Sequence, residues 1–121
     1  MVARILVVDD IEANVRLLEA KLTAEYYDVM VAYDGPTAIA MAAAETPDIV
    51  LLDVMMPGMD GFEVCRRLKD DVATRHIPVV AVTAFAMKGD EERIREGGCE
   101  AYISKPISVM SFLDTVRRHL G

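Results

Sequence analysis

The chain contains 121 residues, 53% of them hydrophobic, which suits one domain with a two-sided core, so we expect a single domain over residues 1–121. Its apolar runs fall well below the roughly 20 residues that a membrane-spanning helix needs, so we predict a soluble, cytoplasmic protein without membrane contact. Its net charge of −7 repels phosphate backbones and anionic lipids, which disfavours nucleic acid as a partner.

Five short segments are predicted to be strands, and helical patterns separate them. The strands are expected at residues 4–8, 28–32, 49–52, 79–82 and 101–103. Three of these segments are continuous aliphatic runs. Such runs are typical of strands that are buried on both faces in a parallel sheet with helices on each side.

The first two helices are predicted from periodicity and from composition. After the first strand, Val15, Leu18 and Leu22 recur at helical spacing. The second helix is expected at residues 36–44, with Pro36 in its first turn. Its alanines permit close packing against a sheet.

The three later helices differ in how firmly they should be held. The third is expected after Pro57 and Gly58, with Asp60 as a plausible N-cap. Its inner face is formed by Val64, Cys65 and Leu68. The fourth, at residues 87–96, has Ile94 as almost its only large aliphatic residue, so we expect it to be the most loosely held. The last carries an apolar stripe of Val109, Phe112, Leu113, Val116 and Leu120.

Strands that alternate with helices in this way predict an α/β fold of five (βα) units, or (βα)5. Right-handed crossovers between parallel strands give an open, doubly wound, five-stranded parallel sheet. We expect the flavodoxin-like strand order 2-1-3-4-5. Ligands of such sheets bind beyond the carboxyl ends of the strands, so the residues just after each strand are the candidates for function.

Polar residues follow four of the predicted strands, and they are Asp9 and Asp10, Asp53, Thr83, and Lys105. Two charges 4 Å apart repel by about 4 kcal/mol at an effective dielectric constant of about 20, so three gathered carboxylates need compensation. Mg2+ provides it, because this ion favours a few carboxylates, waters and a phosphate oxygen. We expect Asp10 and Asp53 to be direct ligands and Asp9 to act through water. The backbone carbonyl of Met55 is a further candidate ligand.

The same residues predict phosphoryl transfer. The Asp53 carboxylate can attack phosphorus as a nucleophile while Mg2+ and the Lys105 ammonium neutralise the transferring oxygens. Thr83 can then donate a hydrogen bond to the bound phosphoryl group. Positioning and charge neutralisation account for most of such a reaction, so no general base is required.

Four sequence blocks carry a resemblance to a known family. They are VVDD at residues 7–10, LLDVMMPGMDG at 51–61, VTA at 82–84 and SKP at 104–106. In this order and at these intervals they resemble the CheY-like receiver domains of response regulators in two-component signal transduction, over the whole chain. Residues 3–75 and 77–108 are each similar to a different member of that family, so a mosaic chain is an open alternative.

The resemblance implies a role for each residue. Asp53 is implied to be the phosphoacceptor, Asp9 and Asp10 the acidic pair, Thr83 the switch hydroxyl and Lys105 the phosphate partner. Tyr102 matches the aromatic switch position. The implied phosphodonor is a sensor histidine kinase or a histidine phosphotransfer protein. The domain is then no enzyme, apart from catalysing its own Mg2+-dependent phosphorylation and dephosphorylation.

Two contact surfaces are expected. Phosphorylation should draw Thr83 inward and let Tyr102 rotate, which biases the helix at 87–96 between two arrangements. The surface for a downstream protein or a second receiver is therefore predicted on that helix, the fifth strand and the last helix. It includes Lys88, Arg93, Arg95, Glu100 and Arg117. The phosphodonor is expected to dock near the first helix, at Ile11, Asn14 and Val15.

Several alternatives stay open. Asp10 could be the N-cap of the first helix, Thr83 an ordinary strand-end hydroxyl and Tyr102 a half-buried aromatic residue. A haloacid-dehalogenase-type hydrolase also forms an aspartyl phosphate, but it requires a second acid two residues after the nucleophile, where this chain has Met55. A flavodoxin-like nucleotide or flavin binder is compatible with the fold alone. A degenerate receiver that acts only as a protein-interaction scaffold is the remaining alternative.

Overall fold

The computed structural model describes residues 3–53, 61–83, 101–104, 114–115 and 117–118, with only the backbone of residue 83 and of residues 101–104. Its elements in chain order are β1 (Arg4–Val8), α1 (Glu12–Ala24), β2 (Asp28–Ala32), α2 (Gly35–Glu45), β3 (Ile49–Asp53), α3 (Gly61–Asp70), β4 (Val79–Thr83) and β5 (Ala101–Ser104). Residues 114, 115, 117 and 118 are also helical. Three predicted features lie outside the described residues: the helix at 87–96, the proposed cap Asp60 and the whole apolar stripe of the last helix.

The five strands form one parallel sheet in the order β2-β1-β3-β4-β5, which confirms the predicted α/β class and strand order. Residues Val7 and Val31 pair across β1 and β2, and Val7 also pairs with Leu51 of β3. The first two strands have the predicted bounds. The other three extend one residue further, so that Asp53, Thr83 and Ser104 are the last residues of their strands.

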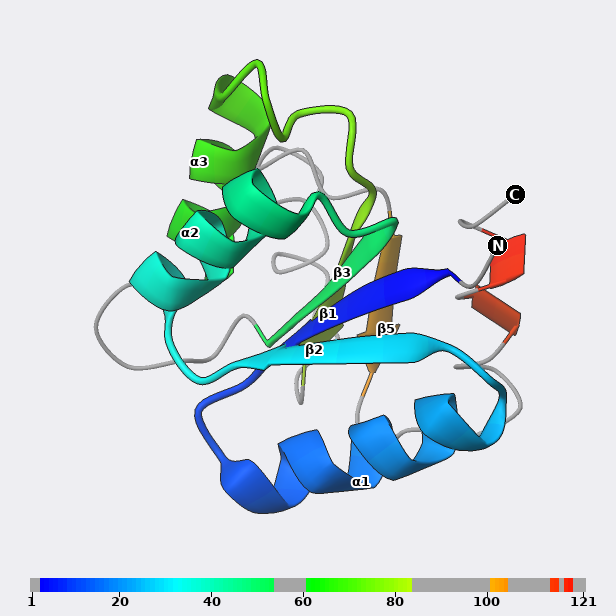
Figure 1. Ribbon diagram of the computed structural model, residues 1–121. Coiled ribbons are helices and arrows are strands. Elements are labelled where there is room, and N and C mark those ends of the chain that lie inside the picture. The colour runs from blue at the N-terminus through cyan, green and yellow to red at the C-terminus, as the bar shows by residue number, and fades with distance from the viewer. Residues whose placement is uncertain (1–2, 54–60, 84–100, 105–113, 116, 119–121) are drawn as a thin grey trace.

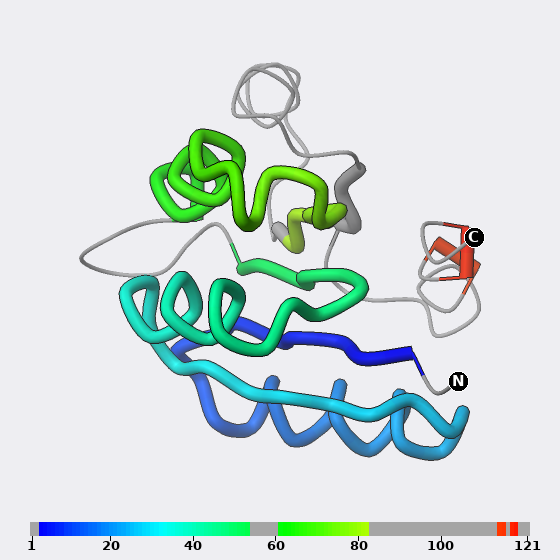
Figure 2. The backbone as a smooth tube through the Cα atoms, turned by 45° about the horizontal axis from the view of Figure 1, so that its top comes forward, coloured from blue at the N-terminus to red at the C-terminus, as the bar shows by residue number. Residues whose placement is uncertain are grey.

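Helices cover both faces of the sheet. Figure 1 shows α1 on one face, whereas α2 and α3 lie on the other; the tube in Figure 2 shows the same separation from a second direction. Parallel strands require crossover connections, and a helix in each connection covers one face of the sheet. The continuous aliphatic runs of the strands are explained by this burial on two sides.

Neighbouring strand residues are divided between two hydrophobic clusters. On the side of α1, Ile5 and Leu51 pack with Leu18 and Leu22. On the other side, Leu6, Val8 and Leu52 pack with residues of α2 and α3, including Ala38, Ala42, Val64 and Leu68. Side chains alternate between the faces of a strand, so one run of aliphatic residues supplies both cores. The predicted inner residues Val15, Leu18 and Leu22 of α1 are all buried.

Helix α2 begins one residue before its predicted start and ends one residue after its predicted end. Asp34 is its N-cap, and the Asp34 carboxylate accepts a hydrogen bond of 2.8 Å from the backbone N–H of Thr37. Pro36 lies in the first turn, as predicted. Thr46 ends the helix with φ of 43°, a left-handed conformation that seldom occurs outside glycine and asparagine. The buried Ala38 and Ala42 let the helix lie close to the sheet.

Arg4, the first residue of β1, links the amino end of this strand to the end of α2. Its guanidinium donates hydrogen bonds to the backbone carbonyl of Glu45 at 2.8 Å and to the Glu45 carboxylate at 2.9 Å. The hydrogen bond to the Glu45 side chain is the main reason why the pKa of Arg4 is raised; the neighbouring carboxylates of Asp28 and Asp48 also raise it. This residue therefore joins β1 to the end of α2.

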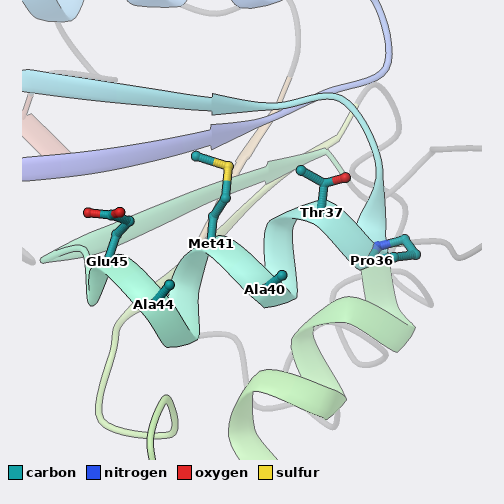
Figure 3. Close-up of a pocket in the computed structure, with 6 residues that line it drawn as sticks. All are labelled: Pro36, Thr37, Ala40, Met41, Ala44 and Glu45. Atoms are coloured by element: carbon teal, nitrogen blue, oxygen red, sulfur yellow. The ribbon is translucent and has the colours of Figure 1, made fainter.

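An open groove of about 530 Å³ runs along α2. Figure 3 shows its lining, which consists of Pro36, Thr37, Ala40, Met41, Ala44 and Glu45. Thr37, Met41 and Glu45 follow one another at intervals of four residues and project from the same side of the helix (Figure 3). None of the acidic residues at the strand ends lines this groove. Within the described part of the chain, no helix has the length and apolar character needed to cross a bilayer.

Candidate acidic site at the strand ends

Strands β1 and β3 bring two aspartates to the same edge of the sheet. Val8, the last residue of β1, pairs with Leu52 of β3, so Asp9 and Asp53 each follow one residue later. Asp9 is 2% exposed and Asp53 is 5% exposed, whereas Asp10 is exposed to solvent. The sequence thus places two acids inside the carboxyl edge of the sheet and a third at its surface.

The three carboxylates lie close together. One carboxylate oxygen from each of Asp9, Asp10 and Asp53 lies within 4.8 Å of the other two. Hard divalent cations such as Mg2+ and Ca2+ prefer oxygen ligands, and carboxylates grouped at this spacing fit that preference. The predicted convergence of these residues is confirmed by their positions.

The backbone at the end of β1 holds Asp9 in place. The Asp9 N–H donates a hydrogen bond of 3.2 Å to the carbonyl of Ala32, which extends the pairing of β1 with β2. The Asp9 Oδ1 atom accepts a hydrogen bond of 2.9 Å from the backbone N–H of Ile11. The N-cap residue of α1 is Ile11, without a side-chain capping bond, so the alternative that Asp10 caps this helix is wrong.

The Ile11 N–H is a site feature that sequence reasoning missed. An aspartate often accepts a hydrogen bond from the N–H two residues further along the chain, and this local turn is the signal that could have indicated it. The predicted role of Ile11 is in a docking surface, through its side chain. The structure adds a role for its main chain.

Two further predicted residues lie on β4, the strand next to Asp53, and on β5 beyond it. Asp53 pairs with Val82, and Thr83 follows at the end of β4, where its backbone pairs with Ser104 of β5. The backbone of Tyr102 pairs with Ala81. Thr83 therefore occupies the same edge of the sheet as the acids. Met55 and Lys105 lie outside the described residues.

The predicted phosphodonor surface needs one correction. Val15 is only 1% exposed and packs into the interior, so its side chain cannot contact a partner. The i, i+3, i+7 pattern that predicted a core face for this residue was the better guide. Ile11, in contrast, is 51% exposed and Asn14 is half-buried, so both remain accessible.

Of the predicted output surface, the structure describes the side chain of Arg117. Its guanidinium donates a hydrogen bond of 3.2 Å to the carboxylate of Glu25, just beyond the end of α1. Both side chains are well exposed, so this ion pair contributes little to stability. Lys88, Arg93, Arg95 and Glu100 lie outside the described residues.

Comparison with known proteins identifies the class of protein to which this fold and site belong. The chain matches the response regulator receiver domain over residues 5–117, and it therefore belongs to the receiver domain family of two-component response regulators. Family membership favours a receiver over the dehalogenase-type and flavodoxin-like alternatives, which share only parts of this pattern.

The individual relatives are response regulators. The chain is 66% identical to response regulator PleD of Caulobacter vibrioides over 117 residues, which are 97% of this chain but 26% of that protein. It is 50% identical to the polar-differentiation response regulator DivK of Brucella ovis over 121 residues, 100% of this chain and 98% of that protein. PleD is the member that residues 3–75 were expected to resemble, and DivK is the one expected for residues 77–108; both similarities extend over nearly the whole chain. The chain spans only about a quarter of the length of PleD.

A solved structure is also similar over nearly its whole length. The receiver domain of a sensor histidine kinase from Pseudomonas aeruginosa PAO1 superposes with a TM-score of 0.92 at 30% sequence identity. The comparison covers 100% of this chain and 99% of that one. That structure is described as having a magnesium ion coordinated in its active site cleft.

Proposed function

We propose that this chain is a single receiver domain that accepts a phosphoryl group on Asp53 from a phosphohistidine donor, with Mg2+ held by the acidic site. The observation that carries the proposal is the convergence of Asp9, Asp10 and Asp53, whose carboxylate oxygens lie within 4.8 Å of one another. Two of these acids are buried, which is an arrangement that a bound cation stabilises. The magnesium ion in the related receiver structure supports the same choice of metal.

The three aspartates have different parts in this site. Asp10 and Asp53 are the proposed direct ligands, and Asp9 acts through a bound water. The carbonyl of Met55 is a further proposed ligand. The exposed position of Asp10 gives the ion an entry path from solvent, whereas the buried Asp9 and Asp53 define the inner wall of the site. When bound, Mg2+ supplies positive charge that stabilises the transferring phosphoryl oxygens.

The chemical step is a displacement at phosphorus. A carboxylate oxygen of Asp53 forms a new bond to phosphorus while the bond between phosphorus and the donor imidazole nitrogen breaks. The imidazole leaves with the electron pair of that bond. The Lys105 ammonium and the Thr83 hydroxyl are proposed to bind the phosphoryl oxygens of the product. The chain thus promotes its own phosphorylation and is not an enzyme acting on other substrates.

The output is proposed to be a change of surface. A phosphoryl group adds about −1.5 to −2 charge and three acceptor oxygens, which draw Thr83 toward Asp53. Tyr102 then rotates. This shifts the equilibrium between two arrangements of the contact surface, which is formed by residues 87–96, β5 and the last helix. The proposed partners are a sensor histidine kinase or histidine phosphotransfer protein as donor, and a downstream protein or a second receiver as target. The proposed location is the cytoplasm.

Intact-mass measurement tests the central step. The parent chain is incubated with Mg2+ and a small phosphodonor such as acetyl phosphate, alongside the variant Asp53→Asn. We expect a single phosphoryl adduct on the parent and none on the variant. Asp48→Asn is the matched control, because Asp48 is an exposed acid at the opposite end of β3 and should leave the adduct unchanged. No adduct on the parent would refute the proposal and favour a scaffold role, whereas an equal adduct on Asp53→Asn would refute Asp53 as the phosphoacceptor.

A further inference from the structure

The backbone of one residue, Ile11, contacts both the acidic site and the first helix. The N–H of Ile11 donates to Asp9 Oδ1 at 2.9 Å. The carbonyl of the same residue accepts hydrogen bonds from the N–H groups of Asn14 and Val15, at 3.1 and 3.2 Å, which start α1. The helix therefore holds Ile11 through its carbonyl, and Ile11 in turn holds the Asp9 carboxylate through its N–H.

A buried carboxylate needs such a partner. Asp9 is 2% exposed, and burial of an ionised carboxylate is tolerated when hydrogen bonds replace its water. A backbone N–H that donates to a carboxylate makes a charge-assisted bond and reduces the effective negative charge of its oxygen. It also removes rotational freedom about the side-chain bonds. Both effects matter more here, because Asp10 and Asp53 present their own carboxylates nearby.

We propose that Ile11 is a positioning residue for cation binding, and that it acts through its main-chain N–H and not through its side chain. This inference rests on the proposed Mg2+ site. The hydrogen bond holds the Asp9 carboxylate in the orientation in which the three acids stand within 4.8 Å of one another. Because hydrogen bonds from the first turn of α1 hold the Ile11 carbonyl, the backbone around Ile11 is fixed and the site is organised before the cation arrives.

Replacing one backbone amide by an ester tests this directly. An ester at Ile11 removes the N–H and keeps every side chain. The matched control is an ester at Glu12, the first residue of α1, where the same chemistry is placed one residue away from the Asp9 bond. Mg2+ affinity is measured by calorimetry, and metal-free stability by urea unfolding. Loss of an outer-shell partner of a metal site typically weakens binding about tenfold or more, and Asp9 acts on the ion through a bound water, so we expect roughly tenfold weaker Mg2+ binding for the Ile11 ester.

A second comparison separates positioning from general destabilisation. In an Asp9→Ala background the Ile11 ester should have no further effect on Mg2+ affinity, because its hydrogen-bond acceptor is gone. If the ester chain fails to fold, Ile11→Pro removes the same N–H by ordinary mutagenesis and the same comparisons apply.

The outcomes are distinguishable from failure of the proposed function. A parent chain that binds no Mg2+ would overturn both the proposed function and this inference. A parent that binds Mg2+ no more tightly than its Ile11 ester would overturn this inference alone. So would an equal loss of affinity in the Ile11 and Glu12 esters, or a loss of the same size in the Asp9→Ala background.

Discussion

Asp9, the residue after β1, and Asp53, the last residue of β3, are both buried, and a carboxylate oxygen of Asp9 lies within 4.8 Å of a carboxylate oxygen of Asp53. At an effective dielectric constant of about 20, two unit charges at that distance repel by about 3 kcal/mol. Without a cation, this repulsion opposes folding. The acidic site therefore lowers the stability of the metal-free chain.

The first prediction concerns that repulsion. Asp53→Asn removes one of the charges and should raise the free energy of unfolding of the metal-free chain by about 1 to 3 kcal/mol. Urea unfolding in the presence of a chelator measures it. Glu19→Gln, at an exposed position of α1, is the control and should change stability by less than about 0.5 kcal/mol. A destabilised Asp53→Asn chain would contradict the prediction.

The second prediction concerns the exposed member of the site. Mg2+ at about 100 times its dissociation constant should stabilise the parent by about 2.7 kcal/mol. In Asp10→Ala this stabilisation should be largely lost, because a direct ligand is missing, while metal-free stability changes little. Thermal unfolding with and without Mg2+ measures the shift. Glu12→Gln removes an exposed acid two residues away and should retain the full shift; equal behaviour of the two variants would argue against Asp10 as a ligand.

The fold was largely predictable because its signals are local and repeated. The aliphatic runs at 49–52 and 79–82 identified buried strands, and the parallel order followed from the alternation with helices. The strand ends were less predictable: Asp53 and Thr83 belong to their strands, because backbone pairing continues one residue beyond the aliphatic run. The last paired residue of a strand depends on the neighbouring strand, so it cannot be predicted from the composition of one segment alone.

The acidic site was predictable in its charged residues and less so in its local contacts. Asp9, Asp10 and Asp53 were identifiable because parallel strands present their carboxyl ends at one edge. The hydrogen bond from the Ile11 N–H was missed, although an aspartate often accepts such a bond from the N–H two residues further along the chain. Val15 was assigned to a docking surface although its spacing with Leu18 and Leu22 marks the core side of α1, and the structure shows it buried. The ion pair of Arg117 with Glu25 joins residues 92 positions apart, a proximity that local patterns do not report.

The third prediction concerns the small residues of α2. Ala42 is fully buried between the helix and the sheet, so Ala42→Leu should overfill the core and cost about 1 to 3 kcal/mol of stability. Ala43→Leu is the matched control, because this neighbour is exposed and should tolerate the larger side chain almost without cost. Urea unfolding of both variants decides the matter. Similar losses at the two positions would indicate that α2 does not pack as described.

The fourth prediction concerns backbone strain after α1. Tyr26 has a φ of 68° and is 87% exposed. It therefore adopts an unfavourable left-handed conformation, and little burial of its side chain compensates for the steric cost. Tyr26→Gly should stabilise the chain by about 0.5 to 1 kcal/mol, because glycine adopts this conformation without a steric penalty. Tyr33→Gly, at an exposed tyrosine outside that region, should give no gain. Thermal unfolding of both variants tests the sign of each change.

The last prediction concerns pH. The backbone N–H of Thr37 donates to the Asp34 carboxylate, and this bond is the main reason why the pKa of Asp34 is lowered from its ordinary value of 3.8. A group whose pKa is lower in the folded chain stabilises folding above its unfolded pKa, and the contribution disappears as the pH falls through the folded value. Asp34→Asn keeps a capping oxygen but cannot ionise. The parent should therefore be more stable than Asp34→Asn near neutral pH, and the difference should shrink as the pH falls below 3.8. Unfolding of both chains by urea across this range measures it. Carboxylates common to both chains cancel in the comparison, so a difference that stays constant with pH would show that the Thr37 bond does not favour the ionised form.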